Sequence, residues 1–256
     1  MGKDISWYGI LLVFTIVLVV VFFQNYKKGS TYSNFSFFER NTVIFLFLLT
    51  GYLGSVSFGI FERYLIKLTR GYQLEVSLGN FAQDVANSST GRWFGSIFLY
   101  AFGILLYALW DRKRRYIQIL DLTLITICLG VIFGKIGCFL DGHYGCYGIP
   151  TELPWGVTFP YGTGATLLPV HPVQIYDAIF HSLLFIILLR MQTKSSIAGM
   201  AGITFLFSTS FYNILIEFIR TNKVIFGGLT FAQLTYIVVI LITLALFLMI
   251  RRPSTA

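Results

Sequence analysis

Charged residues are scarce in this chain. Asp, Glu, Lys and Arg together make up 12% of its 256 residues, about half of their share in an average soluble domain. Apolar residues reach 56%, and 26 of the residues are Phe. Such a composition is typical of a protein embedded in a lipid bilayer, and it excludes a disordered chain or an ordinary soluble domain.

Cysteine is also rare, with three residues. Their spacing does not match the CxxC pattern of structural metal centres, and we expect neither a metal nor a cofactor. Cys128 is expected to be a small apolar residue inside a helix. Cys138 and Cys146 are close enough in sequence to form a disulfide, and they could equally be free thiols.

Long apolar runs make up most of the chain, and a transmembrane helix needs about 20 mostly apolar residues. The first run lacks the basic start and the small-residue cleavage site of a signal peptide, so it predicts a retained helix. The sequence shows no linker or internal repeat, so we expect residues 1–256 to form one transmembrane domain. The predicted fold is an all-α polytopic membrane protein with seven transmembrane helices near residues 5–23, 42–61, 93–110, 116–139, 172–190, 197–219 and 230–250.

Positive charge is in excess, with a formal net charge of +8. In so apolar a chain, Lys and Arg in cytoplasmic loops explain this excess, and we expect no binding to nucleic acid. Basic residues follow alternate predicted helices, at 27–28, 111–115, 190–194 and 251–252. The positive-inside rule therefore predicts an outer N-terminus and a cytoplasmic C-terminus. The two longest connections, about 62–92 and 140–171, would then be outer loops, and long ordered loops are usually functional.

Polar side chains within the predicted spans gather near the outer ends. Gln174 and Asp177 share one helix face, and Asn213, Glu217 and Arg220 share another. Ionisable groups at membrane depth are costly, so they usually mark a functional site. We expect a cavity in the outer half of the bilayer, suited to a ligand with an anionic head and an apolar tail. Its predicted lining is Lys135, Asp141, His143, Asp177, Glu217 and Arg220.

Five separated motifs give the chain a family resemblance. They are ISWYG at 5–9, GKIGCFLDG at 134–142, PTELPWG at 150–156, HPVQIYD at 171–177 and EFIR at 217–220. In order and spacing they resemble motifs of the prolipoprotein diacylglyceryl transferase family of bacterial inner-membrane enzymes. The resemblance extends along the whole chain and implies the same seven-helix fold.

The resemblance also implies an activity. Such enzymes move the diacylglyceryl group of phosphatidylglycerol to the lipobox cysteine of a prolipoprotein, and the thioether forms as glycerol phosphate leaves. A multi-pass protein of the bacterial inner membrane is then expected, with its active site toward the outer leaflet. We expect Lys135 and Arg220 to hold the phosphate, and His143, oriented by Asp141, to generate the thiolate. The expected substrate-binding residues are Tyr8, His171, Gln174, Asp177, Asn213 and Glu217.

Several positions depart from the family pattern. Lys135 and Asn213 stand where the family has Arg, and His143 stands where it has Glu. These departures keep open a divergent member that transfers or processes a phospholipid with a different acceptor. A lipid-binding protein or a transporter is a further alternative, although transporters usually show repeats and midplane sites.

Some of these residues also have purely structural explanations. Lys135 could extend its side chain to the membrane interface, and His171 could hold the start of a helix. Gln174 and Asp177 could form a structural network between helices. For His181 we favour a buried, hydrogen-bonded histidine of the core.

Overall fold

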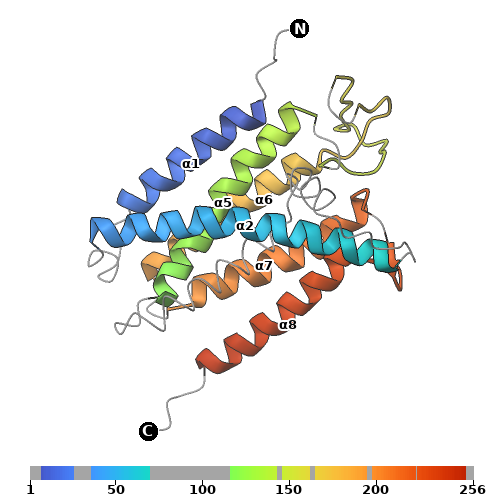
Figure 1. The fold of residues 1–256 in the computed structure, drawn as a ribbon. Coiled ribbons are helices and arrows are strands. Elements are labelled where there is room, and N and C mark those ends of the chain that lie inside the picture. The colour runs from blue at the N-terminus through green and yellow to red at the C-terminus, as the bar shows by residue number, and fades with distance from the viewer. Residues whose placement is uncertain are drawn as a thin grey trace, which may run out of the picture. The chain divides into compact units, whose positions relative to one another are not determined.

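The computed structural model describes residues 7–25, 36–69, 116–142, 146–161, 165–194, 198–222 and 224–251. These residues are mostly helical (Figure 1). The chain divides into two compact units, Met1–Ser33 with Asp121–Ala256, and Asn34–Leu120. The described α-helices are α1 (Trp7–Asn25), α2 (Phe37–Thr69), α5 (Tyr116–Leu140), α6 (Val173–Lys194), α7 (Met200–Ile216) and α8 (Phe231–Arg251).

Four of these helices are long and apolar enough to cross a membrane, with candidate spans Ile117–Leu140, Val173–Gln192, Met200–Ile219 and Phe231–Leu248. They match the fourth to seventh predicted spans closely. Helix α1 contains a shorter apolar stretch, Gly9–Asn25. The third predicted span, 93–110, lies outside the described residues. A multi-pass membrane protein is therefore supported, with four candidate spans among the described helices.

Helix α2 is longer than the predicted second span. It begins after Ser36, whose hydroxyl accepts a hydrogen bond from the Glu39 backbone N–H (3.2 Å) while the Glu39 carboxylate accepts one from the Ser36 N–H (2.7 Å). This reciprocal capping box defines the start of a helix. At its other end α2 continues to Thr69, so the expected outer loop at 62–92 was wrong for its first residues. No Gly or Pro interrupts residues 62–69, which explains the extension.

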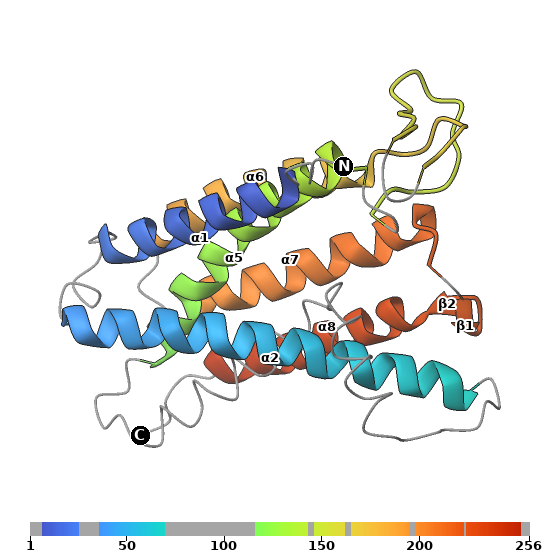
Figure 2. The same ribbon diagram turned by 45° about the horizontal axis from the view of Figure 1, so that its top comes forward.

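Aromatic contacts hold α1 against its neighbours in the first unit. Phe14 meets Phe133 of α5 edge to face at a centroid distance of 5.2 Å, and Phe22 lies 5.9 Å from Phe185 of α6. Helix α7 packs against both α6 and α8. Figure 2 shows α7 between these two helices.

The N-terminus of α7 is held by a buried carboxylate from α5. Asp121 accepts hydrogen bonds from the backbone N–H groups of Gly199 and Gly202, each at 2.7 Å. A negative charge at this point also matches the helix dipole. These hydrogen bonds fix the start of α7 against α5. Because a helix is rigid, they also help to position the other end of α7.

The α5–α6 loop connects α5 to α6, and its described parts, residues 141–142, 146–161 and 165–172, lie beyond the ends of the two helices (Figures 1 and 2). Its buried residues Tyr147, Phe159 and Val170 form a small core. Gly148 N–H donates to the carbonyl of His171 (2.9 Å). A Cβ on Gly148 would lie 2.4 Å from the Ile219 carbonyl oxygen, so only glycine permits this close approach. The loop thereby joins the start of α6 to the end of α7.

A short hairpin separates α7 from α8. After the 3-10 helix η3 (Glu217–Ile219), strand β1 (Val224–Phe226) pairs antiparallel with β2 (Leu229–Thr230). Gly227 and Gly228 form the turn with positive φ angles of 55° and 82°, as tight hairpins require. The expectation of a purely helical fold missed this hairpin, although adjacent glycines are a recognised turn signal.

Candidate active site

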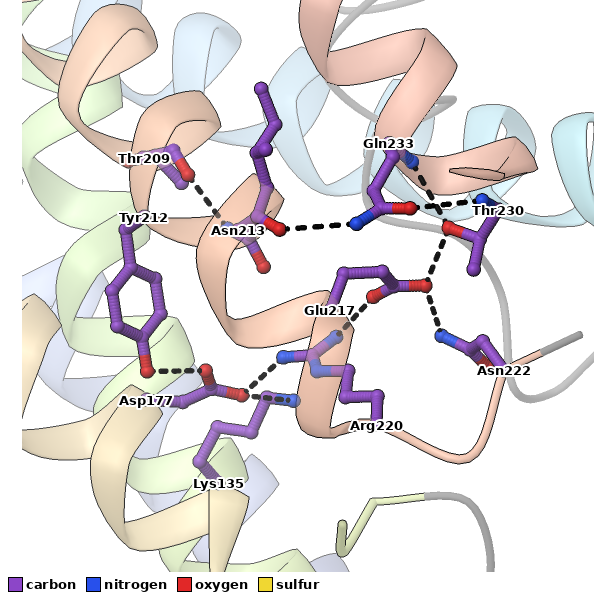
Figure 3. A network of polar contacts seen from close by, with 11 residues as sticks. Lys135, Asp177, Thr209, Tyr212, Asn213, Glu217, Arg220, Asn222, Thr230 and Gln233 are labelled. Carbon is purple, nitrogen blue, oxygen red and sulfur yellow. Dashed lines mark hydrogen bonds and ion pairs between the residues drawn. The ribbon is translucent and has the colours of Figure 1, made fainter. Parts of the chain in front are cut away.

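Asp177 lies at the centre of a polar cluster whose side chains come from α5, α6, α7 and the residue that follows η3 (Figure 3). It is buried in the second turn of α6. Its Oδ2 atom lies 2.7 Å from Lys135 Nζ of α5 and 2.7 Å from Arg220 Nη2, just after η3. Its Oδ1 atom accepts a hydrogen bond from the Tyr212 hydroxyl of α7 (3.0 Å). We call Lys135, Asp177, Tyr212 and Arg220 the Asp177 cluster.

The members of the Asp177 cluster differ in exposure. The Asp177 side chain is 2% exposed, Arg220 17% and Lys135 26%. Removing charges from water is costly, and a buried ion pair often adds no net stability over apolar packing. The burial of these charges is therefore not explained by stability alone. Lys135 is the most exposed of the three charged members.

Glu217 holds the other side of Arg220. Its Oε2 atom lies 3.9 Å from Arg220 Nη1. Its Oε1 atom accepts hydrogen bonds from Asn222 Nδ2 (2.6 Å) and from the Thr230 hydroxyl (3.0 Å). Burial acts to lower the pKa of the Arg220 guanidinium, but the attraction to Asp177 and to further neighbours that include Glu217 together outweighs it and raises the pKa above its ordinary value. Arg220 is thus a permanent cation placed between two acids.

The start of α8 completes this support. Thr230 N–H donates to Gln233 Oε1 (2.9 Å), and Gln233 N–H donates to the Thr230 hydroxyl (3.2 Å). This is a capping box at the helix N-terminus. Gln233 Nε2 also donates to the Ile214 carbonyl of α7 (3.3 Å). Figure 3 shows these contacts continuing from Glu217 to Gln233, so α7 and α8 are tied together beside Arg220.

Some buried polar atoms near the cluster have no hydrogen-bond partner among the described residues. Both amide atoms of Gln174 are in this group, as are Thr209 Oγ1, Glu217 Oε2 and Arg220 Nε. Gln174 precedes Asp177 by three residues on α6, so the two share one helix face. Buried polar groups are normally satisfied. These atoms are therefore available to a polar ligand.

Comparison with known proteins shows which family the chain belongs to. A family model described as prolipoprotein diacylglyceryl transferase matches residues 1–249. The chain belongs to the prolipoprotein diacylglyceryl transferase family. Curated relatives named phosphatidylglycerol–prolipoprotein diacylglyceryl transferase include proteins of Clostridium tetani (28% identity, covering 86% of this chain and 82% of the relative) and Idiomarina loihiensis (27%, covering 97% and 88%). A third, from Bordetella avium, is 28% identical and covers 98% of this chain and 92% of the relative.

The structure brings together four of the residues expected in the transferase site. They are Lys135, Asp177, Glu217 and Arg220. Asn213 lies in the last turn of α7, just before Glu217 opens η3, but its side-chain amide donates to the Thr209 carbonyl of its own helix (2.8 Å). Sequence spacing placed Asn213 and Glu217 on one helix face without showing that local hydrogen bond.

Other expected residues make separate contacts or lie outside the described residues. Asp141 accepts a hydrogen bond from the Trp7 backbone N–H (3.0 Å) at an exposed position. His171 is partly buried, with Nδ1 3.4 Å from the Tyr176 hydroxyl. His143 and the side chain of Tyr8 lie outside the described residues. The proposed pairing of Asp141 with His143 therefore stays a prediction.

His181 and Tyr212 both contact Asp177. His181 is buried, and its Nδ1 donates to the Asp177 backbone carbonyl (2.8 Å), which fits the expected core histidine. Sequence reasoning missed Tyr212, because a single tyrosine in an aromatic-rich span carries no distinguishing signal. Asn222 and Thr230 were also missed. For Thr230 a signal was present, since threonine followed three residues later by glutamine is a capping-box pattern.

Proposed function

We propose that this chain transfers the diacylglyceryl group of phosphatidylglycerol to the lipobox cysteine of a prolipoprotein, at the Asp177 cluster. Membership of the family makes the protein a transferase, and the names of its curated relatives state the same two substrates. In the reaction, the thiol sulfur bonds to a glycerol carbon of the diacylglyceryl group. The bond between that carbon and the phosphate oxygen breaks at the same time. The thiol loses its proton to a base, and glycerol phosphate leaves.

The observation that carries this proposal is the sharing of one carboxylate oxygen by two cations. Lys135 Nζ and Arg220 Nη2 both lie 2.7 Å from Asp177 Oδ2. One carboxylate does not neutralise two cations, and Glu217 is farther from Arg220, at 3.9 Å. The partly exposed Lys135 can thus turn from Asp177 to the phosphate of a lipid. Asp177 would hold both cations ready for that exchange.

The two cations would also serve the chemical step. The phosphate gains negative charge as the carbon–oxygen bond breaks, and positive groups already in position stabilise that charge without reorganisation. Tyr212 and Glu217 would keep Asp177 and Arg220 in place. Gln174, with both amide atoms free of partners among the described residues, would bind the polar part of the lipid. Tyr8, His171 and Asn213 are further proposed substrate contacts.

The thiol needs a base because free cysteine ionises near pH 8.5. His143, oriented by Asp141, is the proposed base. Both follow α5 in the chain, directly after the helix that carries Lys135. This assignment of the base is independent of the assignment of the phosphate site, so an error in the first would leave the second unchanged.

We further propose one domain of seven spans over residues 1–256, with the N-terminus outside and the C-terminus in the cytoplasm. The site would then face the outer leaflet of the bacterial inner membrane. The supporting geometry is that Lys135 lies near the end of α5, Asp177 near the start of α6 and Arg220 after α7. Three successive helices thus present charge at one end. The basic Arg190 lies in the last turns of α6, toward the other end.

A direct assay tests the proposal. Purified protein is incubated with vesicles of phosphatidylglycerol and a lipobox peptide, and the peptide is analysed by mass spectrometry. We expect a diacylglyceryl thioether on the cysteine, and no product with a peptide in which serine replaces it. An unmodified cysteine peptide, under conditions in which a curated relative modifies it, would reject the proposal.

Asn213 favours a second candidate function. It stands where the family pattern has a positive charge, and its amide is engaged with the Thr209 carbonyl. Less positive charge at the site suits a different lipid or acceptor. Lipid and lipoprotein analysis of a strain lacking this protein separates the two. Loss of the thioether supports the main proposal, and unchanged lipoproteins with altered phospholipids support the second.

A further inference from the structure

Two cysteines lie together beside the proposed lipid site. Cys138 is in the last turn of α5 and is 8% exposed. Cys146 is partly exposed in the α5–α6 loop. Their thiols lie within hydrogen-bonding reach of each other, and neither takes part in a disulfide among the described residues. Thiols within hydrogen-bonding reach need only a small movement to reach the geometry of a disulfide.

The position of this pair connects two parts of the site. Cys138 follows Lys135 by three residues on α5, so the two lie about one helical turn apart. Cys146 precedes Gly148 by two residues, and Gly148 forms a β-bridge with Arg220. A covalent link between the cysteines would therefore tie the loop segment beside Arg220 to the helix that carries Lys135.

We propose that Cys138 and Cys146 are a redox-active pair that forms an intramolecular disulfide next to the lipid site. The inference rests on the proposed function for one point, the placement of the site at the outer face, where disulfides form and persist. Each thiol gives up one proton, and the pair gives up two electrons. An oxidised thiol–disulfide oxidoreductase accepts them, so its disulfide becomes a dithiol as the new sulfur–sulfur bond forms.

The difference in exposure sets the order of the exchange. Cys146 is the accessible thiol, so it would form the mixed disulfide with the oxidoreductase. Cys138 is held against it and would then attack the Cys146 sulfur and release the oxidoreductase. The third cysteine, Cys128, is fully buried in the middle of α5, and the structure gives it no cysteine partner among the described residues. It provides an internal control.

Differential alkylation tests the pair. Membranes from cells with an intact thiol-oxidising system are denatured in the presence of N-ethylmaleimide, which alkylates free thiols. Disulfides are then reduced, and the thiols released are alkylated with a heavier maleimide. Peptides are read by mass spectrometry. We expect Cys138 and Cys146 to carry the second label together, whereas Cys128 carries the first. In C146S, Cys138 should move to the first label, and in C138S, Cys146 should do the same. First label on both cysteines of the wild-type protein would overturn the proposal.

The two single variants protect the test against misfolding. C138S alters a buried position, whereas C146S alters a partly exposed one, so at least the second is expected to fold. The label does not depend on catalysis. An inactive protein with the disulfide would reject the proposed function alone, and an active protein with free thiols would reject the redox pair alone.

Discussion

Asp177 and Arg220 are 43 residues apart in the chain, yet Asp177 Oδ2 lies 2.7 Å from Arg220 Nη2. The same oxygen lies 2.7 Å from Lys135 Nζ. Both cations therefore pair with the same carboxylate oxygen. Removing one partner from a buried charge cluster is costly because the other charges stay behind without compensation.

The Asp177→Asn variant tests this dependence. The amide keeps the shape of the side chain but leaves two cations beside a neutral group. We expect the free energy of unfolding to fall by about 3 kcal/mol, the lower end of the range for a broken buried pair, and transfer activity to be lost. Thermal unfolding in detergent and the peptide assay measure the two effects. Glu152→Gln, at an exposed position of the α5–α6 loop, is the control, and wild-type stability of Asp177→Asn would contradict the central role of the acid.

Lys135 is expected to act by its charge. Lys135→Met removes the cation that is most open to the lipid, and the catalytic rate should fall by about 10²–10³-fold, as for other groups that stabilise developing charge. Lys135→Arg, which restores the charge, should recover most of that loss. Steady-state kinetics with phosphatidylglycerol vesicles measure both. Arg190→Met, an exposed cation of α6, should leave the rate unchanged; equal losses in Arg190→Met and Lys135→Met would show a general effect of charge.

Gly148 is expected to be required for its lack of a side chain. In Gly148→Ala the new Cβ would lie 2.4 Å from the Ile219 carbonyl oxygen, so the α5–α6 loop must move away from Arg220. We expect a loss of about 1–3 kcal/mol in stability, typical of overpacking, together with weaker lipid binding. In Gly130→Ala the nearest atom outside the helix, Thr15 Cγ2, would be 3.9 Å away, an ordinary contact. Comparable melting temperatures for the two variants would refute the steric argument.

Asp121 is expected to matter for stability and not for substrate binding. Asp121→Asn replaces one acceptor with a donor that faces a backbone N–H at the start of α7. A loss of about 1–2 kcal/mol is expected for such a cap. The 17 residues of α7 separate this end from the site by about 25 Å, so KM for phosphatidylglycerol should stay unchanged. A higher KM in a fully folded Asp121→Asn protein would show coupling between the two ends.

Sequence reasoning located the cluster because charge within an apolar span is conspicuous. Lys135, Asp177 and Arg220 stand out against their neighbours, and the alternation of helices places them at one end. Sequence spacing also grouped Asn213 with Glu217, but it could not show that Asn213 would bond to Thr209 one turn away. Polar side chains that satisfy a carbonyl of their own helix and those that reach a ligand have the same spacing.

The amino-acid sequence by itself determined which of the described segments are apolar helices and that Lys135, Asp177 and Arg220 lie near helix ends, because periodicity and local capping act within a few residues. Tertiary structure alone decided that two cations share one oxygen of Asp177, that Tyr212 supports it, and that Gly148 brings the α5–α6 loop against Arg220. These contacts depend on the rotation of each helix about its axis and on how neighbouring helices pack. Helix rotation and helix packing are both determined by contacts between side chains that are distant in the chain, and no local sequence pattern predicts such contacts.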